Sequence, residues 1–147
     1  MLPTIPRLIA GLCLGFLAFT VSEMAKWEWP EGTYFGAMSA WNALFGFLIG
    51  WVMLGTRLTG GYISGISNGF TITAFGAVIV LLIHGADEMV DLAMRNRYNG
   101  FMAAFSGIFQ NAFDYGVKVA TRDILITLFV GGCLSGLLLE WVGKRWR

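Results

Sequence analysis

Charged side chains are scarce in this chain. Lys, Arg, Asp and Glu together make up 13% of its 147 residues, against about a quarter in an ordinary soluble domain. The longest stretch without any of them runs from Leu58 to Ala86. Ten basic and nine acidic side chains give a net charge of +1, which leaves no basic patch of the kind that nucleic acid requires. This balance argues against nucleic acid as a partner, and a chain of 147 residues has room for one membrane domain, so we expect no soluble domain beside it.

Histidine and cysteine are scarcer still. The chain has one histidine, His84, and two cysteines, Cys13 and Cys133, which both lie inside apolar runs. A thiol in such a run behaves as a small hydrophobic group, and neither cysteine belongs to a CxxC or a metal-ligand spacing. No Ser/His/Asp arrangement, phosphate-binding loop or HExxH motif is present. The sequence therefore predicts no enzyme activity, no catalytic residue, no metal ion and no cofactor.

Long apolar runs account for most of the chain. A helix needs about 20 mainly apolar residues to cross the ~30 Å hydrocarbon layer of a bilayer. The first run resembles a signal peptide, but no A-x-A-like cleavage site follows it, so we expect a retained helix. We predict an all-α, polytopic integral membrane protein with one membrane domain over residues 1–147. Its four transmembrane helices are expected at about 5–24, 35–54, 68–90 and 123–142.

The segment over residues 99–119 has a different pattern. Its apolar residues, four phenylalanines among them, follow helical spacing. Polar residues repeat every four positions on the other side: Ser106, Gln110, Asp114 and Lys118. A narrow polar stripe on a broad apolar face is typical of a helix that lies in the membrane interface. We predict an amphipathic interfacial helix here, with a fifth span or a re-entrant segment as the alternative.

Glycines four residues apart occur in three of the four expected spans. In lipid there is little hydrophobic drive between helices, so small residues that let backbones approach hold helices together. Gly61, Gly65 and Gly69 continue the spacing through the second connection. We predict tight helix packing within the chain, with the face of an oligomer or of a partner as the alternative, at these pairs: Gly11 and Gly15, Gly46 and Gly50, Gly132 and Gly136.

One group of polar residues has the composition of a chemical site. Imidazole and carboxylates on one helix face can bind a divalent cation or relay protons, but metal sites in helical bundles draw ligands from several helices. We therefore predict a polar face that supports folding or contacts a partner, and that binds no metal. It lies near the outer end of the third span and continues into the next connection: His84, Asp87, Glu88, Asp91, Arg95 and Arg97.

Basic residues are divided evenly between the two sides of a four-span protein. Five lie on the side of the termini and five on the other, but three of the first five cluster in the C-terminal KRWR. Basic residues near helix ends favour the cytoplasmic side of a membrane. We therefore expect both termini in the cytoplasm.

Several short motifs occur in order along nearly the whole chain. They include PEGT at residues 30–33, SNGFT at 67–71, RYNG at 97–100 and the closing TLFVGG, GLLLEW and RWR. In this order and at this length, the chain resembles the TrgA family of small bacterial inner-membrane proteins, which are named for tellurium resistance. The resemblance implies a multi-pass protein of the bacterial inner (cytoplasmic) membrane with a link to tellurite tolerance. It implies no catalytic or binding residues.

Two functions follow as hypotheses. The first is a non-enzymatic, resistance-associated membrane protein that acts on oxyanion tolerance or on the membrane redox state. The alternative is an accessory or assembly subunit of a larger bioenergetic complex, respiratory or photosynthetic. Transport by the chain alone is disfavoured because no arginine is embedded mid-membrane beside a broken helix. The expected partners are the lipid bilayer and either another membrane protein or a second copy of the chain.

Overall fold

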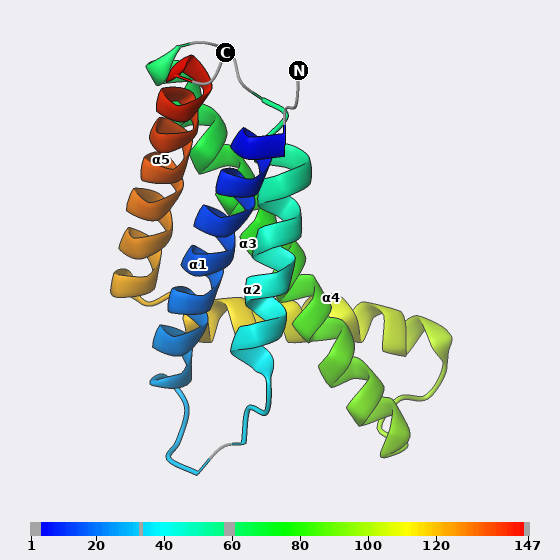
Figure 1. Cartoon of the computed structure of the whole chain (residues 1–147). Coiled ribbons are helices and arrows are strands. Elements are labelled where there is room, and N and C mark those ends of the chain that lie inside the picture. The colour runs from blue at the N-terminus through cyan, green and yellow to red at the C-terminus, as the bar shows by residue number, and fades with distance from the viewer. Residues whose placement is uncertain (1–3, 33, 58–60, 146–147) are drawn as a thin grey trace. The chain divides into compact units, whose positions relative to one another are not determined.

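The computed structural model describes residues 4–32, 34–57 and 61–145, and these ranges contain helices joined by turns (Figure 1). The all-α prediction is confirmed for this part of the chain. Arg147 of the C-terminal basic cluster and Thr33 of the PEGT motif lie outside the described residues. The elements are α1 (Thr4–Lys26), α2 (Met38–Ile49), the π-helical turn η1 (Gly50–Leu54), α3 (Tyr62–Met94), α4 (Phe101–Val119) and α5 (Arg122–Arg145).

Three of these helices are long and apolar enough to cross a membrane: α1, α3 and α5. The fourth apolar segment, α2 with η1, covers Met38–Leu54 and is shorter. It begins three residues later than predicted, because Met38 closes a turn onto the carbonyl of Phe35 (N···O 3.1 Å) and Gly36 takes a positive φ of 52°. The helices predicted at 5–24, 99–119 and 123–142 begin and end within three residues of the predicted limits.

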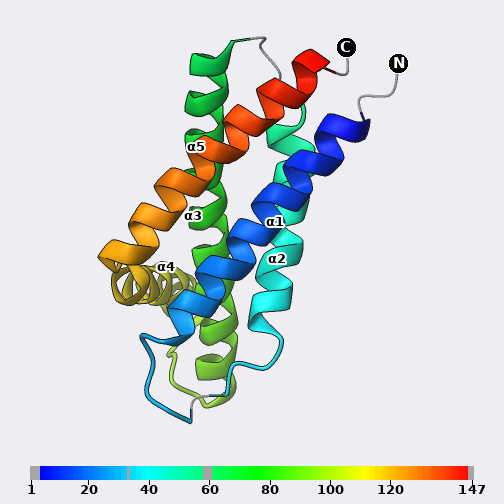
Figure 2. The same cartoon turned by 60° about the vertical axis from the view of Figure 1, so that its left-hand side comes forward.

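The chain divides into two compact units. The first, here called the bundle unit, contains α1, α2, η1, α3 as far as Gly76, and α5. The second, here called the hairpin unit, contains the rest of α3 and α4, from Ala77 to Thr121. Within the bundle unit, α2 and α5 both run alongside α1 (Figures 1 and 2).

The third helix is longer than its predicted span at residues 68–90. It begins at Tyr62, so Gly65, which was expected in the second connection, lies inside the helix, as does Gly69 within its predicted span. The physical reason is tertiary: both glycines pack against α5, and this contact outweighs the low helix propensity of glycine.

The far end of α3 has a recognisable stop. Asn96 adopts a left-handed φ of 52°, and the N–H of Arg97 donates to the carbonyl of Leu92 (3.1 Å). The N–H of Asn96 itself donates to the carbonyl of Ala93 (3.0 Å). This pair of bonds is the Schellman arrangement, which satisfies the last carbonyls of a helix and ends it.

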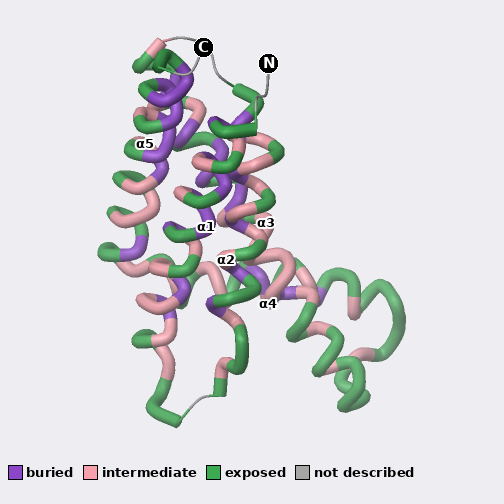
Figure 3. The backbone as a smooth tube through the Cα atoms, in the orientation of Figure 1, coloured by how far each residue is buried: buried purple, intermediate pink, exposed green. Residues whose placement is uncertain are grey.

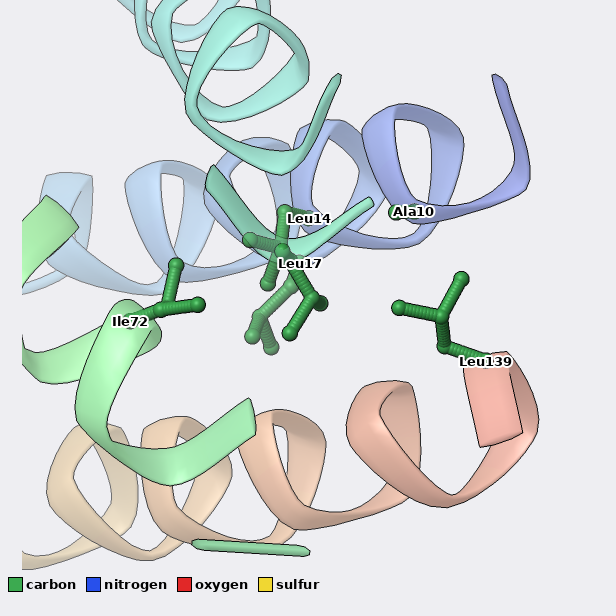
Figure 4. Close-up of a cluster of buried hydrophobic side chains, with 6 residues drawn as sticks. Ala10, Leu14, Leu17, Ile72 and Leu139 are labelled. Atoms are coloured by element: carbon green, nitrogen blue, oxygen red, sulfur yellow. The ribbon is translucent and has the colours of Figure 1, made fainter. Parts of the chain in front are cut away.

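The interior of the bundle unit is small and apolar. Its buried side chains come from α1, η1, α3 and α5, and five of them are labelled in Figure 4: Ala10, Leu14, Leu17, Ile72 and Leu139. Large apolar side chains also cover the outside; Phe16 on α1, for example, is 74% exposed. In Figure 3 the buried residues of α1 and α5 (purple) alternate along each helix with intermediate (pink) and exposed (green) residues. An apolar outer surface of this kind suits a lipid environment.

A first glycine seam, formed by Gly11, Gly15, Gly46 and Gly50, joins α1 to α2 and η1. A methyl group at Gly46 would lie 2.6 Å from the carbonyl oxygen of Leu14. One at Gly50 would collide with the carbonyl oxygen of Ala10, and one at Gly15 would lie 3.1 Å from that of Ala43. The two helices are antiparallel and in backbone contact, which only residues without a side chain permit here.

A second glycine seam, formed by Gly65, Gly69, Gly132 and Gly136, joins α3 to α5. A methyl group at Gly132 would lie 2.8 Å from Oγ1 of Thr73, and one at Gly69 would lie 2.8 Å from Cα of Gly136. Gly136 and Gly65 are in backbone contact. This seam places the start of α3 beside the end of α5.

Candidate functional site

The predicted polar face lies in the hairpin unit, on the second half of α3 and the turn that follows it. His84 is half-buried, whereas the side chains of Asp87, Glu88 and Asp91 are exposed. The spacing i, i+3, i+4 and i+7 places these four residues on one side of the helix. Arg95 and Arg97 are exposed near the end of α3. The polar face is therefore partly covered by protein at His84 and is exposed from Asp87 onward.

Helix α4 packs against this part of α3 through a small residue. A methyl group at Gly85 would lie 2.5 Å from the carbonyl oxygen of Ile108 and 2.8 Å from Cβ of Ala112. This close approach brings Tyr115 over His84, and the two rings are stacked with their centroids 5.4 Å apart and their planes at 10°. Tyr115 was not predicted from the sequence as part of this site. A small residue beside His84, namely Gly85, was the one sign that another helix would cover it.

The environment of Tyr115 favours its neutral form. Burial raises the pKa of its phenol, and the nearby carboxylates of Glu88 and Asp87 raise it further, since a phenolate would be poorly solvated and repelled there. The tyrosine and the histidine therefore meet as a flat aromatic pair at the inner limit of an acidic surface. This arrangement anchors α4 on α3.

The acidic residues of this face are not gathered as ligands. Among the described residues, no three His, Cys, Asp or Glu side chains are placed to hold a metal ion. In the part of the chain that the structure describes, no ion pair joins the side chains of Asp91 and Arg95, although the N–H of Arg95 donates to the carbonyl of Asp91 (3.3 Å). That no metal binds to this face stays a prediction.

A buried polar network joins α1 to α2 at one end of the bundle unit. Asn42 donates through Nδ2 to Oγ of Ser22 (2.8 Å), which in turn donates to the carbonyl of Ala18 (2.7 Å). Both side chains are buried. Ser39 donates to Oε1 of Glu23 (2.6 Å) one turn away. Hydrogen bonds between helices in a low-dielectric interior stabilise the pair and set its register.

The Glu23 carboxylate also forms a salt bridge with Lys26 (Oε1 to Nζ, 2.7 Å). This network was not predicted from the sequence, because its members lie on two helices and its bonds between them join residues sixteen and twenty positions apart. The available signal was the presence of polar residues in or beside two apolar runs, namely Ser22, Glu23 and Asn42.

Glu140 is the most deeply buried charged residue of the described part, with 2% of its surface exposed. It lies on α5 directly against Gly65 of α3. Four residues later, the ammonium group of Lys144 lies 3.7 Å from the centre of the Tyr62 ring. These contacts lie at the last turns of the second glycine seam. The start of α1 lies at the same end of the bundle unit.

Searches of protein-family models, curated proteins and solved structures found no match for this chain.

Proposed function

We propose that this chain is a four-span protein of the bacterial inner membrane with α4 as an interfacial helix. The three long apolar helices support three of the spans. The support for the fourth is the first glycine seam, which holds the apolar segment Met38–Leu54 along α1. At 1.5 Å per residue these 17 residues reach about 25 Å, a length that a locally thinned bilayer accommodates.

The proposed role of this membrane protein is non-enzymatic support of tellurite tolerance, through oxyanion handling or the membrane redox state. The motifs that resemble the TrgA family carry this proposal. The observation that favours a non-transporting role is the backbone contact along both glycine seams, because helices packed so closely fill the interior of the bundle unit with protein atoms.

The decisive experiment is a deletion of the gene in its source organism, followed by growth in graded tellurite. We expect the deletion to lower tolerance and the wild-type gene to restore it. Complementation with the variant Gly50→Ile, which disrupts the first seam, should fail, whereas Gly76→Ala should succeed. Unchanged tolerance in the deletion strain, with the wild-type protein shown to be present in the parent, would contradict the proposed role.

The alternative function, an accessory or assembly subunit of a larger membrane complex, has one structural observation in its favour. The four phenylalanines of α4 are all exposed; Phe101 is 81% exposed and Phe113 is 71% exposed. The first three rings form aromatic pairs along the helix, Phe101 with Phe105 and Phe105 with Phe109. Such a row suits either lipid or an apolar protein surface.

Purification in a mild detergent, followed by mass spectrometry, separates the two functions. A stoichiometric membrane-protein partner that is lost when Phe105 and Phe109 are replaced by Ser would favour the accessory role. A second copy of this chain as the partner would indicate a homo-oligomer. Recovery of the chain alone would favour the resistance role without a partner.

A further inference from the structure

Four cationic side chains gather at one end of the bundle unit. Arg7 lies in the first turns of α1, Arg57 follows η1, and Lys144 and Arg145 end α5. The seams bring these elements together: the backbone of Ala10 contacts Gly50, and Gly65 contacts Glu140. The starts of α1 and α3 and the ends of η1 and α5 therefore share one end of the unit, which is the upper end in Figure 1.

Arg7 packs closely against Gly55, which has no side chain. Its Cα and Cγ lie 2.6 and 2.7 Å from the position that a methyl group at Gly55 would take. The stem of the arginine is therefore packed on backbone, and the residue is half-buried. Its Nε is buried and has no hydrogen-bond partner among the described residues. An unpartnered guanidinium nitrogen in such a place is costly unless an anion or another acceptor completes it.

The other three cationic residues also contact neighbouring groups of the bundle unit. The carbonyl of Arg57 accepts a hydrogen bond from Nδ2 of Asn68 (3.3 Å) while its side chain is exposed. Lys144 lies over the ring of Tyr62, and the guanidinium of Arg145 lies 5.4 Å from the centre of the Trp141 ring. In the described ranges, none of these four cations forms an ion pair with a carboxylate.

The opposite end of the same unit has the reverse balance. There the described residues include two cations, Lys26 and Arg122, and Lys26 already pairs with Glu23. Four carboxylates accompany them: Glu23, Glu28, Glu31 and Asp123. Among the described residues of the cationic end, the one acidic side chain is Glu140, and it is buried. The bundle unit is therefore cationic at one end and acidic at the other.

Apolar side chains surround the cationic end. Ile5 and Leu8 on α1 and Ile63 on α3 are exposed, the last of them by 85%. A free phosphate ion gains nothing from these groups, whereas the acyl chains of a lipid can lie on them. Guanidinium groups bind phosphate oxygens through paired hydrogen bonds, and cations near a membrane surface attract anionic lipids.

We propose that Arg7, Arg57 and Lys144 form a binding site for the phosphate headgroup of an anionic phospholipid. In this site the guanidinium group of Arg7, whose stem is packed on Gly55, donates to the phosphate, and Arg57 and Lys144 neutralise the phosphate charge from the exposed side. The acyl chains lie along the apolar surface of α1 and α3. This inference rests on the proposed location in a membrane. It adds the class of lipid that binds at one end of the bundle unit.

Native mass spectrometry of the detergent-purified chain, titrated with phosphatidylglycerol or phosphatidylcholine, tests the site. We expect phosphatidylglycerol to bind more tightly, and each of Arg7→Gln and Arg57→Gln to weaken it about five-fold, the value for one basic side chain near a lipid surface. Arg7→Lys should retain part of the lost affinity. Arg122→Gln, at the opposite end of the unit, is the matched control and should leave binding unchanged.

Three outcomes would overturn the site. These are equal binding of the two lipids, equal loss in the Arg122→Gln control, and complete displacement of phosphatidylglycerol by millimolar inorganic phosphate, which would indicate a simple anion site. Carbonate extraction of native membranes keeps the two proposals apart. Release of the chain by carbonate would contradict the membrane location, whereas a retained chain without lipid preference would contradict the headgroup site alone.

Discussion

Gly69 and Gly76 lie about two turns apart on α3, and what surrounds them differs. A methyl group at Gly69 would collide with the carbonyl oxygen of Gly132 and lie 2.8 Å from Cα of Gly136. A methyl group at Gly76 would meet only the two methyl carbons of Ile49, at 3.4 and 3.5 Å. Backbone atoms cannot move aside without moving a whole helix, whereas a flexible side chain can. The same residue type therefore has a packing role at one position and little consequence at the other.

We expect Gly69→Ala to lower the stability of the detergent-solubilised protein by about 1–3 kcal/mol, the usual cost of overpacking. Gly76→Ala should leave stability unchanged or raise it slightly, because alanine favours helix more than glycine does. Thermal melting followed by circular dichroism measures both variants. Equal melting temperatures for the two variants would contradict the importance of the second glycine seam.

His84 is the other residue whose role depends on its neighbour. It lies under the ring of Tyr115, and the carboxylates that follow it on α3 are exposed. A histidine covered by an aromatic ring is a packing group first. A metal ligand would need further donors from other helices.

We therefore expect elemental analysis of protein purified without chelator or affinity metal to show no stoichiometric metal ion. The double variant His84→Ala/Glu88→Gln should lower thermal stability through loss of the ring contact, and Asp91→Asn, at the exposed end of the same face, serves as the control. Metal bound by the parent and absent from the double variant would make an ion-dependent site the leading hypothesis.

Helix α4 has three faces of different character. It contacts α3 through Ile108 and Ala112, while its row of phenylalanines and its stripe of polar residues are both exposed. A helix with an apolar row, a polar stripe and one contact face is suited to lie in the membrane interface, where each face meets a matching medium.

Single-cysteine labelling in native membranes tests this placement. Ser106→Cys and Gln110→Cys should react with a water-soluble maleimide, whereas Phe105→Cys and Phe109→Cys should be protected by lipid. All four positions are exposed in the chain itself, so a difference between them measures the surrounding medium. Protection of Ser106→Cys and Gln110→Cys from both sides of the membrane would favour the fifth-span alternative.

For the whole molecule, the arrangement of charge suggests a fixed orientation. The end of the bundle unit that holds the start of α1 and the end of α5 is cationic, and the opposite end is acidic. Basic residues are retained on the cytoplasmic side of a membrane. We accordingly place both termini in the cytoplasm as part of the proposal.

Reporter fusions check this topology. Alkaline phosphatase fused after Glu31, Arg97 or Thr121 should be active, and fusions after Arg57 or Arg145 should be inactive. If α4 crosses the membrane, the fusions at Arg97 and Thr121 will differ from each other. If α2 with η1 does not cross it, the fusions at Glu31 and Arg57 will agree.

The positions of most helices could be predicted from local composition. A helix in lipid must satisfy its backbone hydrogen bonds within its own segment, so the length and polarity of each run indicate where a helix lies. The limits of α1, α4 and α5 were predicted within three residues for this reason. The composition of the candidate face on α3 was equally apparent, because its histidine and its three acidic residues lie within eight positions of one helix.

Pairing between helices was not readable in this way. Several glycines share the same spacing, and nothing local states that α1 meets α2 while α3 meets α5. The start of α3 at Tyr62, the cover of His84 by Tyr115 and the bond from Asn42 to Ser22 all depend on contacts between segments distant in sequence. Apolar runs specify helices because backbone hydrogen bonding is local, whereas packing selects among similar faces through shape, which exists only once the helices have met.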